Sequence, residues 1–479
     1  METKSICEIV RKEEQDWTQG ETTYSKYVKF SLYNNLNRID AYLNSKHISG
    51  EKDHLDREKP FFNIVTAAVN IWYRATDIDR KNIKIKATKS GDYIKSILAN
   101  IHLQEFMKKQ SFGMFLNEWG RVLSRNGSAI VKFVEKKKGL ICEVVPWNRI
   151  ICDAVDFENN PAIEQLWLTP AQLLERVDTH GYNKDYVEKI IANSSTTIRK
   201  LKDNETVDTK ADYIPIYELH GNLSRAVYKK AKGEDETEGD NKVYFKQMHT
   251  VCFLESKEEK GKFNDYSLYS GKENEVYLLT HLIKEDGRIL GIGAIEHLFE
   301  AQWMINHSQK MIKDQLDLVS KVVFQTSDGN YVGRNILTNI ENGDIMIHQP
   351  NQSLTQLANN SHDIVSLQNF GNQWLMLSKE ITATPDAIRG NTMPSGTAYR
   401  QVAILNQEAN SLFELMTENK GLAIEEMMRK FILPFLKKKM DTAEEISATL
   451  EAYQITQIDN IYIPNKAKIK INQLNKEKV

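Results

Sequence analysis

The chain has 479 residues, 41% of them hydrophobic, so it can bury several cores and lacks the composition of a disordered protein. Its 63 basic and 65 acidic residues give a net charge of −2, which argues against a broad basic surface that grips nucleic acid. There is no run near 18 consecutive apolar residues and no secretory apolar core in the charged first twenty residues, so we expect a soluble, intracellular protein of two to four domains.

The four cysteines are Cys7, Cys142, Cys152 and Cys252, and they form neither a CxxC motif nor a cluster with histidine at zinc spacing. We expect buried free thiols, although Cys142 and Cys152 would be able to pair if they lay on adjacent strands. We predict no metal site and no cofactor.

Helical spacing of apolar and aromatic residues predicts helices over 24–43, 60–76 and 101–125. The alternating sequence IKIKA predicts a strand over 82–87. We expect these elements to belong to an α+β region that covers the N-terminal 290 residues.

A β-hairpin is predicted next, because residues 128–135 and 140–145 are strand-like and flank a lysine-rich turn. Thr169 and Pro170 predict the start of a helix that runs to residue 177, with the threonine as its N-cap and the proline in its first turn.

Between residues 211 and 283 the pattern changes to β-branched and aromatic runs separated by charged loops. The predicted strands are 213–220, 226–229, 242–255 and 275–283, and the predicted loops are 229–240 and 256–275.

One long helix is predicted over residues 291–324, because apolar residues recur at alternating steps of three and four. Gln302 and Gln309 occupy positions in this apolar seam. Gly291 and Gly293 are expected to loosen the chain just before the helix.

Residues 332–348 contain two short strand-like pieces around an Asn342–Gly343 turn. A second helix is predicted over 363–382, and a loop rich in proline and glycine over 383–396.

A third long helix should span residues 397–433, bend near Gly421 and be kinked or reset by Pro434. A short helix over 443–453 and a strand-like tail complete the predicted elements.

The sequence contains no P-loop, HExxH, GxSxG or kinase motif. Gly291-Ile292-Gly293 lacks the third glycine of a dinucleotide site. His297 and His307 are ten residues apart and do not share a metal, and His281 is expected to be a satisfied core residue on an apolar strand. We therefore expect no enzyme activity.

The order of these parts resembles the portal proteins, or head–tail connectors, of tailed bacteriophages. The resemblance covers most of the chain, and its strongest points are GIGAIE at 291–296, running into Gln302 and Asn306, and PSGTAY at 394–399. The N-terminal runs KPFFNIV, RNGSA and VPWNRI are also similar. The abundance of Lys, Asn and Ile suggests the crAss-like phages.

The resemblance implies an α+β, portal-like subunit with an α/β wing, a long-helix stem, a small clip insert, a channel loop and a short crown. The implied parts are the wing (1–290), stem helix 1 (291–324), clip (325–362), stem helix 2 (363–382), channel loop (383–396), long wing helix (397–440) and crown (441–479). The crown departs from the family pattern, because it is short and ends strand-like.

The resemblance also implies the function: a ring of twelve subunits at one capsid vertex of the virion, assembled in the host cytoplasm, that conducts double-stranded DNA during packaging and ejection. The implied partners are the major capsid protein, the terminase, the neck and tail adaptor proteins, and DNA held without sequence specificity. We expect no membrane partner.

Three groups of residues follow from this map. The predicted DNA-channel residues are Lys310, Lys313, Asp314, Asp317, Lys321, Arg389, Asn391, Thr392 and Met393. The predicted contacts between subunits in the stem are Gln302, Gln309 and Trp374. The predicted clip-docking residues are Tyr331, Arg334, Asn335, Asn342 and Asp344.

Two of these roles have a physical argument. The predicted helix over 291–324 carries four acidic and three basic side chains, and a nearly neutral lining would let a polyanion slide without sticking. Arg389 would touch the phosphate backbone without reading bases. The alternatives are that the helix charges are simply solvated and that Arg389 pairs with a carboxylate of a neighbouring subunit.

Two other functions stay open. The chain would be a monomeric or dimeric scaffold if its long helices formed an internal bundle. It would be a metal-dependent nucleic-acid enzyme, such as a nuclease, if distant carboxylates came together in the fold.

Overall fold

The computed structural model describes residues 5–20, 22–25, 28–54, 56–86, 93–136, 139–193, 199–200, 206–207, 213–235, 237, 239–255, 263–272, 275–319, 324–325, 350–351, 355–356, 362–384 and 399–440. In this part, helices and antiparallel sheets occur together, which confirms the α+β class. The chain forms two compact units: unit 1 comprises Met1–Asp40, Val69–Glu296 and Thr397–Val479, and unit 2 comprises Ala41–Ala68 and His297–Gly396.

The larger sheet of unit 1 has five antiparallel strands in the order β11-β10-β9-β6-β5. Their bounds are β5 Ile150–Ile151, β6 Ala162–Leu168, β9 Ile214–Ser224, β10 Tyr244–Glu255 and β11 Phe263–Lys272. Helices α6 (Pro170–His180) and α7 (Lys184–Asn193) bury Leu173, Val187 and Ile190 against this sheet, where they meet Ile214 and Ile216. Helix α1 (Ile6–Gln19) also contacts β10 and β11.

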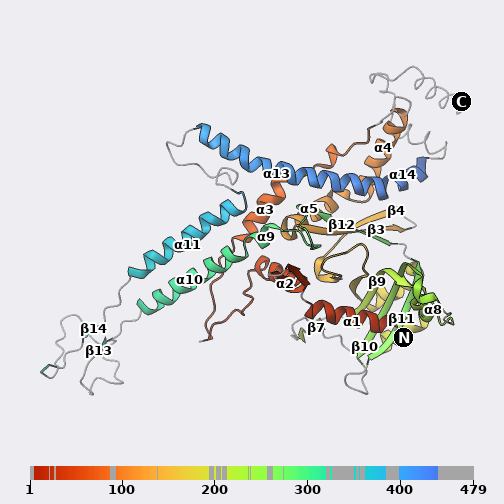
Figure 1. Cartoon of the computed structure of the whole chain (residues 1–479), viewed down its shortest axis with the longest axis horizontal. Coiled ribbons are helices and arrows are strands. Elements are labelled where there is room, and N and C mark those ends of the chain that lie inside the picture. The colour runs from red at the N-terminus through yellow and green to blue at the C-terminus, as the bar shows by residue number, and fades with distance from the viewer. Residues whose placement is uncertain are drawn as a thin grey trace. The chain divides into compact units, whose positions relative to one another are not determined.

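The smaller sheet of unit 1 has the order β12-β3-β4, with β3 Ser128–Lys136, β4 Gly139–Val145 and β12 Glu275–His281 (Figure 1). Helix α5 (Phe112–Asn126) packs on it, and Trp119 Nε1 donates a hydrogen bond of 2.9 Å to Thr280 Oγ1. The predicted hairpin is confirmed as β3–β4. His281 is hydrogen-bonded to Ser128 through Nδ1, as predicted, but its side chain is half-buried and not part of the core.

The remaining described elements are short or helical. They are β1 Thr22–Ser25, β2 Val28–Phe30, α2 Leu32–Leu43, α3 Val65–Ala75, α4 Tyr93–Lys109, β7 Arg199–Lys200, β8 Thr206–Val207, α8 Arg225–Lys232 and the 3₁₀ turns Arg80–Asn82, Trp147–Arg149 and Asp240–Lys242. Helix α6 begins as predicted, because Thr169 and Gln172 form a reciprocal capping box and Pro170 is in the first turn. None of the helices described is long and apolar enough to cross a membrane.

Several predicted elements of the N-terminal half were wrong in type or extent. Residues 24–43 do not form one helix, because the β-formers at 22–30 pair as β1 and β2 before α2 begins. Residues 101–125 belong to two helices, separated at Ser111, whose φ of 51° is left-handed. Residues 83–86 follow a 3₁₀ turn and are not a strand.

The region 211–283 also differs from the prediction. Residues 226–229 lie in α8 and not in a strand, because a run as short as Ala226-Val227-Tyr228 does not distinguish the two. The predicted loop over 256–275 contains β11, whose polar composition hides the alternation that buries Tyr266 and Leu268. All four cysteines are free thiols, so Cys142 and Cys152 do not form a disulfide.

The last described helix of unit 1 runs as α13 (Tyr399–Met427), a π-helical turn (Met428–Ile432) and α14 (Leu433–Met440). The departure from α geometry therefore lies beside Pro434 and not at Gly421. Proline has no N–H to donate within the helix, and its ring clashes with the carbonyl group of the preceding turn. A wider, π-helical turn just before Pro434 relieves this clash. Phe431 of this turn stacks on Phe133 of β3 at 4.1 Å.

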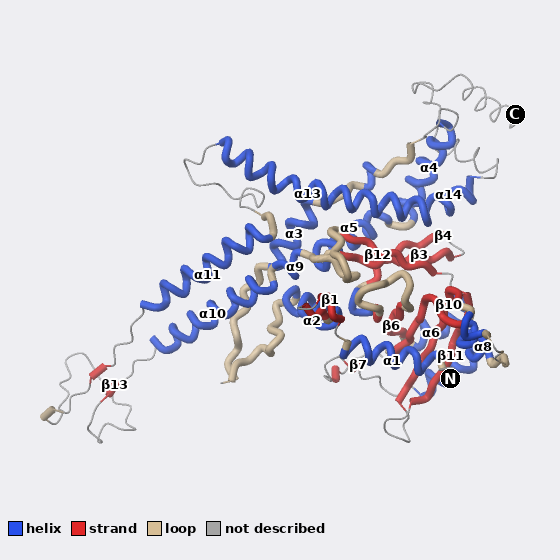
Figure 2. Tube along the Cα trace, viewed as in Figure 1, coloured by secondary structure: helices blue, strands red, loops and turns tan. Residues whose placement is uncertain are grey.

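The described part of unit 2 contains a helix pair and a segment from earlier in the chain. Helices α10 (Phe299–Val319) and α11 (His362–Ile381) run side by side, as Figure 2 shows, and β13 Phe324–Gln325 pairs with β14 Thr355–Gln356. The predicted helix over 291–324 begins later than expected, with the short α9 (Ala294–His297) before α10. It also ends earlier than predicted, because Phe324 belongs to β13.

The glycines ahead of α9 do not loosen the chain. A Cβ on Gly293 would lie 2.1 Å from Arg125 O, and a Cβ on Gly291 would lie 2.4 Å from Ile283 O. Gly127 has a φ of +75°, and a Cβ on it would lie 2.5 Å from the backbone carbon of Gly291. These glycines allow three backbone segments to approach one another where side chains would collide.

Candidate functional site

The α10–α11 pair of unit 2 holds all the described residues for which the sequence predicted a stem role. On the contact side Ile305 and Ile312 of α10 are buried, and Gly371 of α11 lies over Ser308. Because Gly371 and Ser308 are small, the two helices approach closely at this point.

A segment from residues 44–64 lies along the charged side of α10. Arg57 donates to Asp314 Oδ1 at 2.9 Å and to Asp53 Oδ2 at 2.8 Å, and its guanidinium is 3.8 Å from Asp317. Lys313 Nζ donates to Glu58 O at 2.9 Å. We call residues 44–64 the strap.

The Asp53 carboxylate is the best-buried charged group of this contact, with 3% of its side chain exposed. Besides Arg57 it has Lys310 Nζ at 4.0 Å. Four of the predicted DNA-channel residues, Lys310, Lys313, Asp314 and Asp317, are thus engaged by the strap inside the subunit.

Gln302 is also used inside the chain, which differs from its predicted role between subunits. Its side chain is fully buried, Oε1 accepts from Ile64 N at 3.0 Å, and Nε2 donates to Phe62 O at 2.7 Å and to Asn306 Oδ1 at 3.0 Å. Asn306 Oδ1 in turn accepts from Phe62 N. Both amide hydrogens of Gln302 are therefore satisfied before any other subunit is considered.

The other two predicted stem contacts lie nearer the surface. Gln309 is exposed, and Trp374 is half-buried and meets Phe370 edge-to-face at 6.3 Å. Lys321, the channel-loop residues Arg389, Asn391, Thr392 and Met393, and the clip residues Tyr331, Arg334, Asn335, Asn342 and Asp344 lie outside the described residues.

Exposed apolar side chains form two stripes on α11. Val365 and Met376 are eleven residues apart, or three helical turns, and are 61% and 64% exposed. Phe370, Leu377 and Ile381 follow at steps of seven and four and form the second stripe.

Helix α10 adds exposed apolar side chains of its own. Trp303 is 51% exposed and stacks on His307, with ring planes 1° apart, and Met311 and Leu316 are exposed farther along the helix. These exposed apolar side chains make the helix pair the candidate interaction surface among the described residues of unit 2.

A second feature, in unit 1, is a buried charge cluster between the two sheets. Lys132 of β3 donates to Glu164 of β6 at 2.9 Å and to Glu218 of β9 at 3.1 Å. Arg176 of α6 donates to the other oxygen of Glu218 at 2.8 Å. Two positive and two negative groups therefore balance in a place from which water is nearly excluded.

Two tyrosines complete the hydrogen bonds of this cluster. Tyr277 of β12 donates to Glu164 at 2.6 Å, and Tyr182 donates to Glu218 at 3.0 Å. Burial opposes the charged form of Glu218, but Lys132 and Arg176 outweigh it and lower the pKa of Glu218 to about 2.

His220 lies next to this cluster and is 2% exposed. Its ring meets Tyr277 edge-on at 4.9 Å, and neither ring nitrogen has a hydrogen-bond partner among the described residues. Burial is the main reason that the pKa of His220 is lowered to about 3, so the ring is neutral at physiological pH.

No sequence pattern indicated these arrangements. Lys132, Glu164 and Glu218 are far apart in the chain, and no motif predicts that Arg57 reaches α10. In the exposed stripes of α11, the apolar periodicity was visible, but it did not distinguish a core face from an assembly face.

Comparison of the sequence with models of known protein families gives no match, and a search of curated proteins finds no match either.

Proposed function

We propose that the chain is the subunit of a portal ring, a structural protein at one capsid vertex through which double-stranded DNA passes. The observation that carries the proposal is the pair of exposed apolar stripes on α11. They lie on different sides of one helix, so a single neighbour would cover only one of them. A ring supplies a neighbour on each side of every subunit, through heterologous contacts that close.

The order of elements supports the same proposal. A mixed helix-and-sheet unit precedes α10, a short paired-strand region, α11 and then the long helix α13. In the proposed ring, α10 and α11 form the stem, the region between them forms the clip that docks the terminase and neck proteins, and residues 383–396 form the channel loop.

The strap changes which residues we propose to face DNA. Lys310, Lys313, Asp314 and Asp317 hold the strap, so DNA contact is assigned to Lys321 and to the channel loop with Arg389, Asn391, Thr392 and Met393. If particles carrying Arg389→Ala package full-length genomes at the normal rate, the assignment of Arg389 is wrong.

The test of assembly is mass photometry of the purified chain, with negative-stain images of the same sample. A portal ring should appear near twelve times 55.2 kDa with an annular top view. The double variant Phe370→Glu/Met376→Glu, one residue from each stripe, should lose the ring. Val155→Glu/Val243→Glu is the matched control, because these two valines are 46% and 45% exposed in unit 1 and lie on no stripe.

A chain that remains monomeric at high concentration and does not associate with heads in infected cells would overturn the proposal in favour of a scaffold. Metal-dependent DNA cleavage by the purified chain would instead indicate a nuclease.

A further inference from the structure

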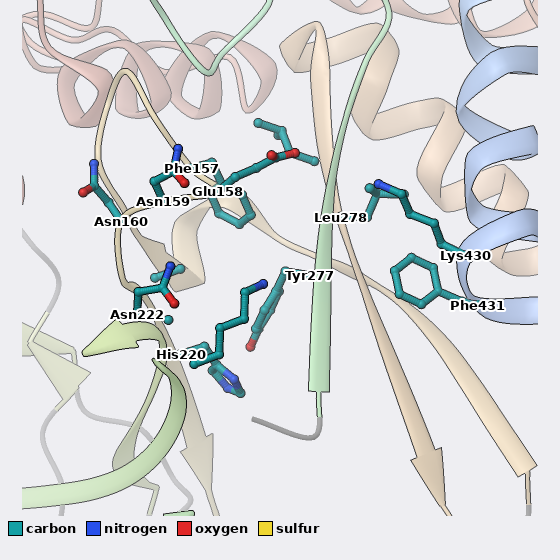
Figure 3. A pocket seen from close by; sticks show the side chains of 14 residues that line it. Phe157, Glu158, Asn159, Asn160, His220, Asn222, Tyr277, Leu278, Lys430 and Phe431 are labelled. Carbon is teal, nitrogen blue, oxygen red and sulfur yellow. The ribbon is translucent and has the colours of Figure 1, made fainter. Parts of the chain in front are cut away.

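A cavity of about 440 Å³ lies in unit 1 beside β12 (Figure 3). Its lining comes from the middle of β12, the end of β9, Lys246 of β10, the loop before β6 and the π-helical turn. The volume is within the range of binding pockets, roughly 300–1,000 Å³. Neither the stem nor the clip of the proposed ring uses this cavity.

The cavity runs along the edge of β12. Tyr277, Leu278 and Leu279 all line it, although successive side chains of a strand point to opposite faces. Phe431, which also lines the cavity, stacks on Phe133, the β3 partner of Val276, and so lies on the sheet face opposite to Tyr277. The cavity therefore reaches both faces of the sheet and passes beside β12. In the described sheet β12 pairs with β3 alone, so this edge is the unpaired one.

An unpaired edge presents backbone hydrogen-bonding groups. In an antiparallel ladder, alternate residues direct their N–H and C=O groups toward the partner strand, and the residues between them direct theirs outward. At least one of the three residues therefore directs its N–H and C=O groups away from β3, toward the side on which the cavity lies. Among the described contacts, the backbone of these residues makes no hydrogen bond beyond the ladder with β3.

A second strand edge lines the same cavity. Strand β9 pairs with β6 only as far as His220, opposite Ala162. Gly221 and Asn222 continue the pairing with β10 and line the cavity on their other side. Gly221 is required here, because its φ is +140° and a Cβ would lie 2.8 Å from Pro161 Cα.

The rim of the cavity is held in place by Asp156. Its Oδ1 accepts from the backbone N–H groups of Glu158 and Asn159 at 3.1 and 3.2 Å, and Oδ2 accepts from the Asn159 amide at 2.7 Å. The loop that faces the two strand edges is thus already ordered, which lowers the entropy cost of binding.

The side chains around the edge define what would fit. Lys246 and Lys430 are exposed lysines of the lining, and Glu158 is the acidic residue among them. Lys430 pairs with Glu426 one helical turn away. This ion pair is exposed to solvent, and such pairs contribute little to the free energy of unfolding. Phe157 and Phe431 supply apolar walls.

We propose that this cavity is the docking site for an extended segment of another protein, which adds as a strand to the edge of β12 and places an acidic side chain near Lys246 and Lys430. Backbone pairing supplies affinity and the alternating side chains supply specificity in this mode of recognition. The residues of this site belong to unit 1, whereas the stripes on which the proposed ring depends belong to unit 2, so different variants test the two proposals.

The experiment is a selection of displayed random nine-residue peptides on the full chain. We expect enrichment of sequences that alternate apolar and polar residues and carry a central Asp or Glu. The best peptide should slow amide exchange within 275–281, and N-methylation of alternate amides along one of its edges should abolish binding.

The matched variants are Lys246→Glu/Lys430→Glu and the control Lys242→Glu/Lys437→Glu, which makes the same charge change at exposed positions outside the cavity. The first should weaken binding of the selected peptide about tenfold or more, and the control should leave it unchanged. The proposal is overturned if selection enriches nothing over the first variant, or if the selected peptides protect no amide in 275–281.

Discussion

Arg57 and Asp314 are 257 positions apart in the sequence, yet their side chains are joined by a hydrogen bond of 2.9 Å. This contact joins the strap to α10, and the strap covers the charged side of that helix. Among the described residues of unit 2, the exposed apolar side chains of α10 and α11 lie outside this contact.

Removing Arg57 should release the strap. In Arg57→Ala the two carboxylates of Asp53 and Asp314 lose their shared donor, so amide hydrogens in 51–59 should exchange faster by mass spectrometry. Lys52→Ala is the control, since it removes an exposed pair with Asp56 inside the same segment. Equal exchange in both variants would show that Arg57 does not hold the strap.

Replacing Lys132 should be strongly destabilising. Lys132→Met leaves Glu164 and Glu218 buried beside each other without their shared cation, which costs about 3–5 kcal/mol in free energy of unfolding. Urea denaturation followed by circular dichroism measures this. Lys184→Met, which removes an exposed pair with Glu188, should stay within about 1 kcal/mol. A loss for Lys132→Met no larger than this control would contradict the role of the cluster.

Stability should fall on acidification below pH 6.5. The pKa of His220 is lowered from 6.5 to about 3 by burial, so between these values the unfolded chain binds a proton that the folded chain does not. Stability therefore rises with pH across this window. The lowered pKa of Glu218, about 2 against 4.5, acts in the same direction below pH 4.5.

His220→Phe tests the histidine contribution. Each proton difference is worth about 1.4 kcal/mol per pH unit, so urea denaturation of the variant should show a slope smaller by about that amount between pH 6 and 4. Above pH 7.5 the wild-type and variant curves should run parallel, which is the internal control. An unchanged slope in the acid range would mean that His220 is charged in the folded protein.

Two glycine substitutions should have opposite effects. Gly293→Ala places a methyl group against the Arg125 carbonyl, at a hypothetical 2.1 Å, and should prevent folding or lower the melting temperature sharply. Gly421 lies inside α13, and no atom lies within 4 Å of the place that a methyl group would occupy, so Gly421→Ala should stabilise the protein by about 0.5–1 kcal/mol. Calorimetry measures the melting temperatures of the two variants. An unchanged melting temperature for Gly293→Ala would refute the close approach of residue 293 to the Arg125 carbonyl.

Elements with strong local signals could be predicted from the sequence. The hairpin of β3 and β4, the N-cap at Thr169 and helix α11 depend on turn residues, cap chemistry and a sustained helical period, and each is found within a few residues of its expected place. Weak or mixed patterns failed. The segment 226–229 was too short to separate strand from helix, and β11 was concealed by its polar residues.

The composition and periodicity of the sequence determined the α+β class and the long helices, because these features follow from interactions between residues close along the chain. Tertiary structure alone decided that Gln302 bonds inside the subunit, that Arg57 reaches α10, and that Lys132 joins Glu164 and Glu218. These pairings join residues from 32 to 257 positions apart, and side-chain type gives no information about a partner so distant. The fold selects the partner by bringing two strands or a loop and a helix to within hydrogen-bonding distance.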